Sequence, residues 1–183
     1  MRKTFRRWAA LVVGALLLLP ACMTAEKKVT RVACVGNSIT YGAGIANRDA
    51  NSYPSQLQYF LGDDFEVRNF GVSGTTLLSK GNSPYVKTTA YTQSKDFRPD
   101  IVLIKLGTND SKPFNWKWKD DFVKDYQQLI DSYRQLPSRP RIILLTPVRC
   151  YLDSPDNINA PVITGGILPL IEQIAYDLSL IHI

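Results

Sequence analysis

Short apolar runs recur along the chain and predict a set of buried β-strands. Residues 32–35, 101–106 and 142–148 are nearly continuous apolar stretches, of a length typical of strands that are covered on both faces. Residues 65–70 alternate less regularly and stop before Gly71, which predicts a fourth strand. Between these runs the spacing of apolar residues changes to one that is typical of helices.

Three segments carry apolar residues three and four positions apart and are predicted to be helical. The first follows Pro54 and ends at Gly62, the second covers residues 120–136, and the third covers residues 167–178. Strands and helices therefore alternate, which favours one α/β domain with a three-layer, doubly wound parallel sheet. Such sheets bind ligands outside the carboxyl ends of their strands, so we expect the functional residues at that edge.

The first 30 residues differ from the rest. Four basic residues precede an apolar run at residues 9–19 that is too short to span a bilayer, so residues 1–21 are predicted to be a secretory signal peptide. The sequence ending at Cys22 resembles a bacterial lipobox, which implies an acylated Cys22 and a tether over residues 22–30. We therefore expect a protein of the bacterial cell envelope, either an outer-membrane lipoprotein or periplasmic. The alternative is a plain signal peptide that is cleaved nearby.

The net charge of +6 overstates how basic the folded part is. Four of the 22 basic residues and none of the 16 acidic ones lie in the predicted signal peptide, so the remainder carries +2. This balance predicts no nucleic-acid partner, and it leaves the lipid anchor as the only expected contact with a membrane. One histidine and two further cysteines, Cys34 and Cys150, cannot form a familiar metal-ligand cluster, so neither a metal nor another cofactor is expected.

Three polar segments follow predicted strands and should therefore meet at one sheet edge. Ser38 lies in residues 36–42, directly after the first strand, where a turn and a helix N-terminus suit a nucleophile and an oxyanion. Gly71 lies in residues 69–74, and Asn109 lies in residues 107–110. Taken singly, these residues also fit a loop serine or phosphate cradle, a turn glycine and a helix cap.

Together, these three segments resemble three of the four sequence blocks of the SGNH (GDSL-type) hydrolase family. The resemblance implies a flavodoxin-like α/β fold and a carboxylic ester hydrolase in which Ser38 is the nucleophile. It further implies that the N–H groups of Ser38 and Gly71 and the side-chain amide of Asn109 stabilise the oxyanion. Asn37 stands where the family has Asp, a nearly isosteric exchange that we expect to affect the turn.

The fourth block of the family, Asp-x-x-His, is absent from this sequence. The single histidine, His182, follows the last predicted helix, and its position does not suit the catalytic base. We therefore expect a hydrolase domain at residues 31–183 that is cut off before its catalytic Asp and His and is practically inactive as given. Residues 178–183 also match a translated adapter of transposon-based sequencing libraries, and we hypothesise that they are not native.

The sequence also suggests a class of substrate. Residues 36–42 and 105–110 look like those of envelope esterases that act on acetylated sugars, so a glycan or small-molecule acetyl ester is the expected substrate. Trp116 and Trp118 could stack on a sugar ring, and residues 84–97 are a second candidate wall. The alternatives are a lysophospholipase or thioesterase, a non-catalytic glycan-binding lipoprotein and a flavodoxin-like cofactor-binding domain.

Overall fold

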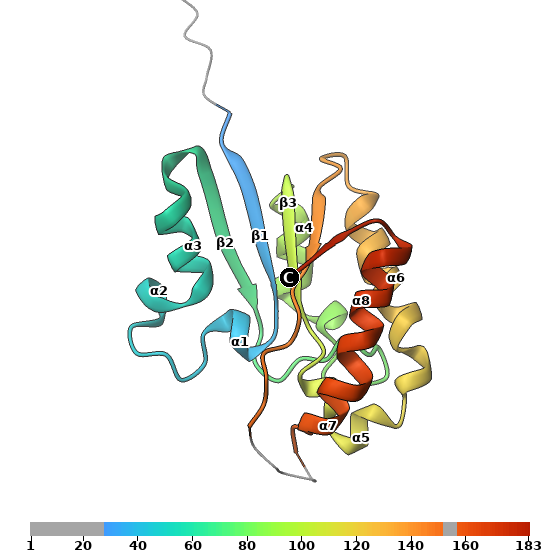
Figure 1. The fold of residues 1–183 in the computed structure, drawn as a ribbon. Helices are drawn as coiled ribbons and strands as arrows, with labels where there is room; N and C mark the ends of the chain where they lie inside the picture. The colour runs from blue at the N-terminus through green and yellow to red at the C-terminus, as the bar shows by residue number, and fades with distance from the viewer. Residues whose placement is uncertain (1–27, 152–156) are drawn as a thin grey trace, which may run out of the picture.

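The sheet has five parallel strands in the order β2-β1-β3-β4-β5 (Figure 1). A computed structural model describes residues 28–151 and 157–183, so the predicted signal peptide and Cys22 lie outside the described residues. The strands are β1 (Thr30–Gly36), β2 (Phe65–Gly71), β3 (Ile101–Lys105), β4 (Arg141–Leu144) and β5 (Ile181–His182). This arrangement confirms the predicted α/β class and doubly wound parallel sheet.

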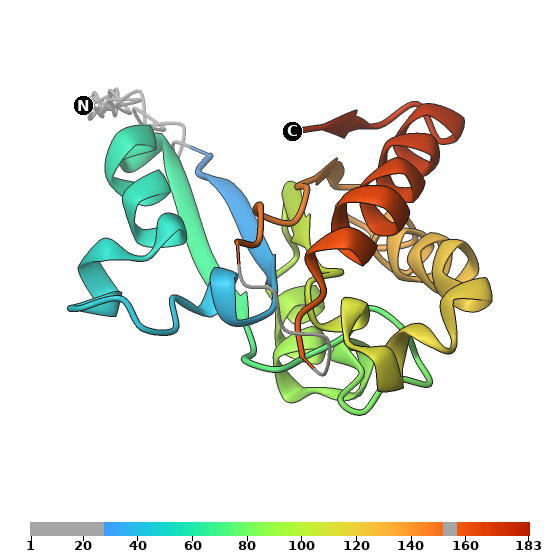
Figure 2. The ribbon, with the colours of Figure 1, turned by 60° about the horizontal axis from the view of Figure 1, so that its bottom comes forward.

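The register of the three central strands fixes the edge at which the predicted functional segments emerge. Gly36, at the end of β1, is aligned with Gly71 at the end of β2 and with Lys105 at the end of β3. The loops that follow these three strands therefore leave the sheet at the same level. Figures 1 and 2 show this end of the sheet, with α1 (Ser38–Tyr41) beside the ends of β1 and β2.

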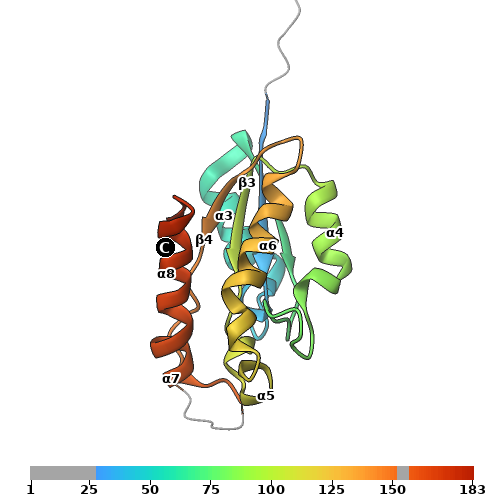
Figure 3. The same cartoon turned by 90° about the vertical axis from the view of Figure 1, so that its right-hand side faces the viewer.

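Helices cover the sheet from both sides. Figure 3 shows α3 (Tyr53–Leu61) on one side of the sheet and α4 (Thr89–Asp96) on the other. Side chains of α6 (Phe122–Arg134) and α8 (Leu168–Asp177) share one buried cluster with β1, β3 and β4. The short helices are α2 (Arg48–Asn51), α5 (Pro113–Trp116) and α7 (Ala160–Val162).

Most of the predicted elements are present, whereas β5 and the short helices α2, α5 and α7 were not predicted, and two further differences have a physical reason. The strand predicted at 142–148 ends at Leu144; the N–H groups of Leu145 and Thr146 still donate to the carbonyls of Ile104 and Ile183, and Pro147 then has no N–H for a ladder. Helix α4 was not predicted because it is largely polar and buries a serine, Ser94, rather than an apolar stripe. It begins at a capping residue, Thr88, whose side chain accepts a hydrogen bond from the Tyr91 N–H.

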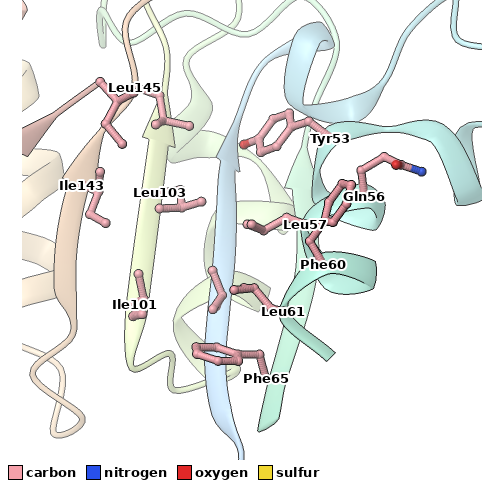
Figure 4. A pocket seen from close by; sticks show the side chains of 12 residues that line it. Tyr53, Gln56, Leu57, Phe60, Leu61, Phe65, Ile101, Leu103, Ile143 and Leu145 are labelled. Carbon is pink, nitrogen blue, oxygen red and sulfur yellow. The ribbon is translucent and has the colours of Figure 1, made fainter. Parts of the chain in front are cut away.

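The two faces of the sheet are covered unequally. On the face toward α4 and α6, alternate residues of β1, β3 and β4 are fully or almost fully buried. On the opposite face, α3 covers β1 and β2, whereas Ile101, Leu103 and Ile143 remain half-buried. These residues line an apolar groove of about 530 Å³ together with side chains of α3 (Figure 4). Ser38, Gly71 and Asn109 do not line this groove.

Within residues 28–151 and 157–183, no helix combines the length and the apolar character that crossing a bilayer requires.

Candidate active site

Ser38 is the first residue of α1, immediately past the end of β1. The preceding Asn37 caps this helix, because its side-chain oxygen accepts a hydrogen bond of 3.1 Å from the Ile39 N–H. The Ser38 side chain is half-buried and therefore accessible, and its own N–H donates to no acceptor among the described residues. The predicted nucleophile thus stands at a helix N-terminus with an unused backbone donor beside it.

Asn37 carries an unusual feature for a buried residue. Its side-chain Nδ2 is inaccessible to solvent and has no hydrogen-bond partner in the part of the chain that the structure describes. A buried donor without a partner costs about 1–3 kcal/mol. Asn37 therefore affects the turn in two opposite ways: its side-chain oxygen caps α1, and its buried Nδ2 has no hydrogen-bond partner among the described residues.

Gly71 lies against α1, as its position at the end of β2 requires. A Cβ at this residue would come within 2.6 Å of the Thr40 carbonyl carbon and 2.8 Å of the Tyr41 Cα, so only glycine allows this close approach. The Gly71 N–H, however, already donates to the Asn69 side-chain oxygen at 2.9 Å. The predicted role of Gly71 as an oxyanion donor would require this bond to break.

Gly74 offers a backbone donor that the sequence analysis did not single out. The chain is tied to β1 just before it, by a bond of 2.9 Å from the Val72 N–H to the Gly36 carbonyl. Gly74 adopts a left-handed conformation with a φ of 83°, and its N–H has no acceptor among the described residues. The signal in the sequence was the second glycine of residues 69–74.

Asn109 approaches this segment from the other side. It begins a short 3-10 turn after β3, is almost fully buried, and donates from Nδ2 to the Thr75 carbonyl at 2.9 Å. Because an amide group has two N–H bonds, one remains for an oxyanion. The segment Val72–Thr75 therefore runs from the end of β1 to Asn109, so the structure brings Ser38, Gly71 and Asn109 to one sheet edge.

The next residue, Asp110, is fully buried and binds the same loop. Its two carboxylate oxygens accept hydrogen bonds from the N–H groups of Leu77 and Leu78, at 3.0 and 2.8 Å. Burial raises the pKa of Asp110 to about 6, the two backbone donors act in the opposite direction, and the charge of Asp125 adds to the rise. Asp110 is therefore a structural carboxylate beside the site.

The catalytic base remains missing from the described residues. His182 lies on β5 at the level of Leu144, Ile104 and Val35, three strand positions from β1. At about 4.8 Å per strand, this separation is roughly 14 Å, too far for a hydrogen bond to Ser38. Among the residues that the structure describes, no group of three His, Cys, Asp or Glu side chains could hold a metal ion.

The aromatic residues that were candidates for a substrate wall mostly pack inside the protein. Trp116 lies edge-on against Phe122, with ring centroids 5.7 Å apart. Tyr85 is fully buried and donates to the Phe70 carbonyl at 2.8 Å, and Tyr91 packs edge-on against it. Trp118 is exposed, and the ammonium groups of Lys80 and Lys117 lie 5.1 and 5.2 Å from its ring. Of these four, Tyr85 is closed to a ligand, Trp116 and Tyr91 are half-buried, and Trp118 is the most exposed.

Two solved structures share the fold. A carbohydrate acetylesterase family member from Sinorhizobium meliloti aligns with 85% of this chain and 82% of its own, at 24% identity and a TM-score of 0.68. A lipase/acylhydrolase from Enterococcus faecalis aligns with 85% of this chain and 75% of its own, at 21% identity and a TM-score of 0.60.

The sequence itself is similar to a named enzyme and to a family. An acetylxylan esterase from Xylanibacter ruminicola is 43% identical over 177 residues, which cover 86% of this chain. The chain spans 37% of the length of that relative. The model of the GDSL-like Lipase/Acylhydrolase family matches residues 34–168, which include Ser38, Gly71 and Asn109. The chain therefore belongs to the GDSL-like lipase/acylhydrolase family.

Proposed function

We propose that this protein hydrolyses carboxylic esters, removing O-acetyl groups from carbohydrates through an acyl-enzyme on Ser38. The observation that carries the proposal is the accessible Ser38 hydroxyl at the start of α1, with unused amide donors of Ser38, Gly74 and Asn109 around the same sheet edge. The named relative adds the substrate class, because it is an acetylxylan esterase with 43% identity.

The reaction follows from these groups. The Ser38 Oγ attacks the carbonyl carbon of the acetyl ester, and the carbonyl oxygen becomes an anion that accepts hydrogen bonds from the Asn109 amide and from backbone N–H groups. Collapse of this intermediate releases the sugar hydroxyl and leaves an acetyl group on Ser38. Water then attacks the acetyl-serine and releases acetate.

Both the attack and the release need a base, and within residues 28–151 and 157–183 no histidine or carboxylate forms a hydrogen bond with the Ser38 hydroxyl. We therefore propose that residues 1–183 alone turn over slowly. Loss of catalytic-triad members reduces turnover by about a millionfold in a well-studied serine protease. The sequence of the source locus after Asp177 tests this proposal, because an Asp-x-x-His block there would supply the missing groups.

We further propose that Cys22 anchors the protein to a membrane of the bacterial envelope. The basic and apolar character of residues 1–21 and the position of Cys22 support this proposal. Metabolic labelling with a fatty acid should mark the protein, and Cys22→Ala should abolish the label. A labelled Cys22→Ala variant would overturn it.

The activity is best tested on the natural gene product with an aryl acetate and with acetylated xylan. Ser38→Ala should abolish release of acetate, because no nucleophile remains at the start of α1. Ser132→Ala is the matched control, since the Ser132 hydroxyl only bonds the Leu129 carbonyl of its own helix α6. Full activity of Ser38→Ala, or equal loss in both variants, would refute the assignment of Ser38.

A further inference from the structure

Besides its local bonds, the loop after Gly74 makes four hydrogen bonds to residues more than 30 positions away in the sequence. The Thr75 carbonyl accepts from Asn109, and three N–H groups that follow Thr76 donate to two aspartates. Leu77 and Leu78 donate to Asp110, and Ser79 donates to Asp125 at 2.7 Å. We call residues Thr75–Ser79 the clamped segment.

The two aspartates hold the loop at a cost in free energy, because both carboxylates are buried. Asp110 is fully buried and Asp125 is almost fully buried, and neither forms an ion pair among the described residues. A buried carboxylate without a cation is costly, because it loses its hydration. The backbone donors of the clamped segment compensate the charge of Asp110, and the Ser79 N–H together with the nearby Lys80 ammonium compensates that of Asp125, so the carboxylates and the loop depend on each other.

The clamped segment is linked directly to the proposed oxyanion donors. Gly74 is the residue before it, and Thr75 orients the Asn109 amide by accepting one of its two N–H bonds. Asn109 and Asp110 are neighbours on one 3-10 turn. This turn is therefore hydrogen-bonded to the segment at Thr75 and again at Leu77 and Leu78. A shift of the segment would therefore move the Gly74 N–H and rotate the Asn109 amide together.

We propose that Asp110 and Asp125 are positioning residues, which hold the Gly74 N–H and the Asn109 amide in the geometry that an oxyanion requires. The catalytic consequence of this proposal rests on the proposed hydrolase function. The positioning of Gly74 and Asn109 by the two aspartates can be tested in the protein without substrate. Misplacement of a catalytic group by about 1 Å can cost roughly 100-fold in rate, which sets the size of the expected effect.

Asp110→Asn is the main test variant, because it keeps the shape of the side chain and turns one acceptor oxygen into a donor that faces a backbone N–H. Asp121→Asn is the matched control, since Asp121 lies in the same region and its side chain accepts from the exposed ammonium of Lys80, just after the clamped segment, rather than from a backbone N–H of that segment. Asp125→Asn removes the charge that is bonded to Ser79 alone. It carries the test should Asp110→Asn fail to fold.

The structural readout is the ¹⁵N–¹H NMR spectrum of residues 1–183. Asp110→Asn and Asp125→Asn should shift the signals of the Gly74 backbone amide and the Asn109 side-chain amide and should accelerate hydrogen exchange at Leu77 and Leu78. Asp121→Asn should leave all of these unchanged. Wild-type signals for Gly74 and Asn109 in a folded Asp110→Asn or Asp125→Asn variant would overturn the proposal.

The catalytic readout is acetyl ester hydrolysis by the natural gene product. Asp110→Asn should lower kcat by about 100-fold with little change in KM, since the displaced donors act on the transition state, and Asp121→Asn should keep wild-type kcat. A rise in KM alone would contradict a positioning role. Absence of turnover in the wild type would refute the proposed function, while the NMR comparison would still decide whether the two aspartates position Gly74 and Asn109.

Discussion

The two sides of the candidate site are held in place by different kinds of contact. On the Ser38 side, the hydrogen bonds that cap and close α1 are local, from Ile39 to the Asn37 side chain and from Tyr41 to the Asn37 carbonyl, and one longer-range bond of 3.3 Å joins the Asn69 side chain to the Tyr41 carbonyl. On the Asn109 side, the clamped segment has local bonds as well, to Val72 and Ser83, but four further bonds join it to residues that lie 32 to 46 positions away. The nucleophile is therefore placed by its own turn, and the proposed oxyanion donors are placed by the fold.

This difference has a consequence for what each side tolerates. A local turn re-forms wherever its residues are present, but it must still fit against the neighbouring strand, and here the fit depends on Gly71. A loop held from distant elements tolerates changes of its own side chains and fails when an anchor is lost. Substitutions at the contact between α1 and β2, and at the buried anchors, should therefore separate the two sides.

Gly71→Ala should have the largest effect on stability. The added methyl group would meet the backbone of Thr40 and Tyr41, which cannot rotate away as a side chain could, so α1 or β2 must shift. Overpacking of this kind costs about 3 kcal/mol of unfolding free energy, measurable by urea denaturation. Gly165→Ala is the control, because its Cβ would meet open space. Equal stability of the two variants would show that α1 does not press on β2.

Asp110 should make stability depend on pH. Its folded pKa of about 6 lies above the unfolded value, so the folded state binds more protons between the two values and its unfolding free energy falls as pH rises through this window. The contribution is complete below about pH 4 and should decrease by roughly 2 kcal/mol by pH 7. The measurement is the difference in unfolding free energy between wild type and Asp110→Asn at both pH values. A difference that is the same at pH 4 and pH 7 would contradict the raised pKa.

The contrast also explains what the sequence could predict. The four strands and the helices α3, α6 and α8 were predicted because their apolar residues follow the period of the element. The location of Ser38 and Asn109 was predicted because each follows a strand within a few residues and parallel strands deliver such residues to one edge, whereas their catalytic roles are implied by the family resemblance. Both signals, the period of the apolar residues and the position of a polar residue after a strand, can be read from a short window of sequence.

What escaped prediction depends on contacts between distant segments. Gly71 and Gly74 look alike in the sequence, and only the bond from Gly71 to the Asn69 side chain shows that one N–H is occupied while the other is unused. Asp110 reads as an ordinary polar loop residue, yet the fold buries it against Leu77 and Leu78. Trp116 was a candidate for sugar stacking, and its edge-on contact with Phe122 packs it partly against the core.

The smallest expected effect concerns the cap of α1. Asn37→Ala removes the acceptor for the Ile39 N–H and also removes the buried Nδ2 that has no partner, so loss and gain partly cancel. Thr88→Ala is the matched comparison. The Thr88 hydroxyl caps α4 by accepting from the Tyr91 N–H and also donates to the Tyr85 carbonyl, so it has both an acceptor and a donor partner. An ordinary N-cap is worth about 1 kcal/mol, which is the loss expected for Thr88→Ala, and Asn37→Ala should lose less. Urea denaturation of both variants measures this order. If Asn37→Ala were the more destabilising change, the buried amide of Asn37 would have to be bonded, and the local side of the site would be held more firmly than its hydrogen bonds indicate.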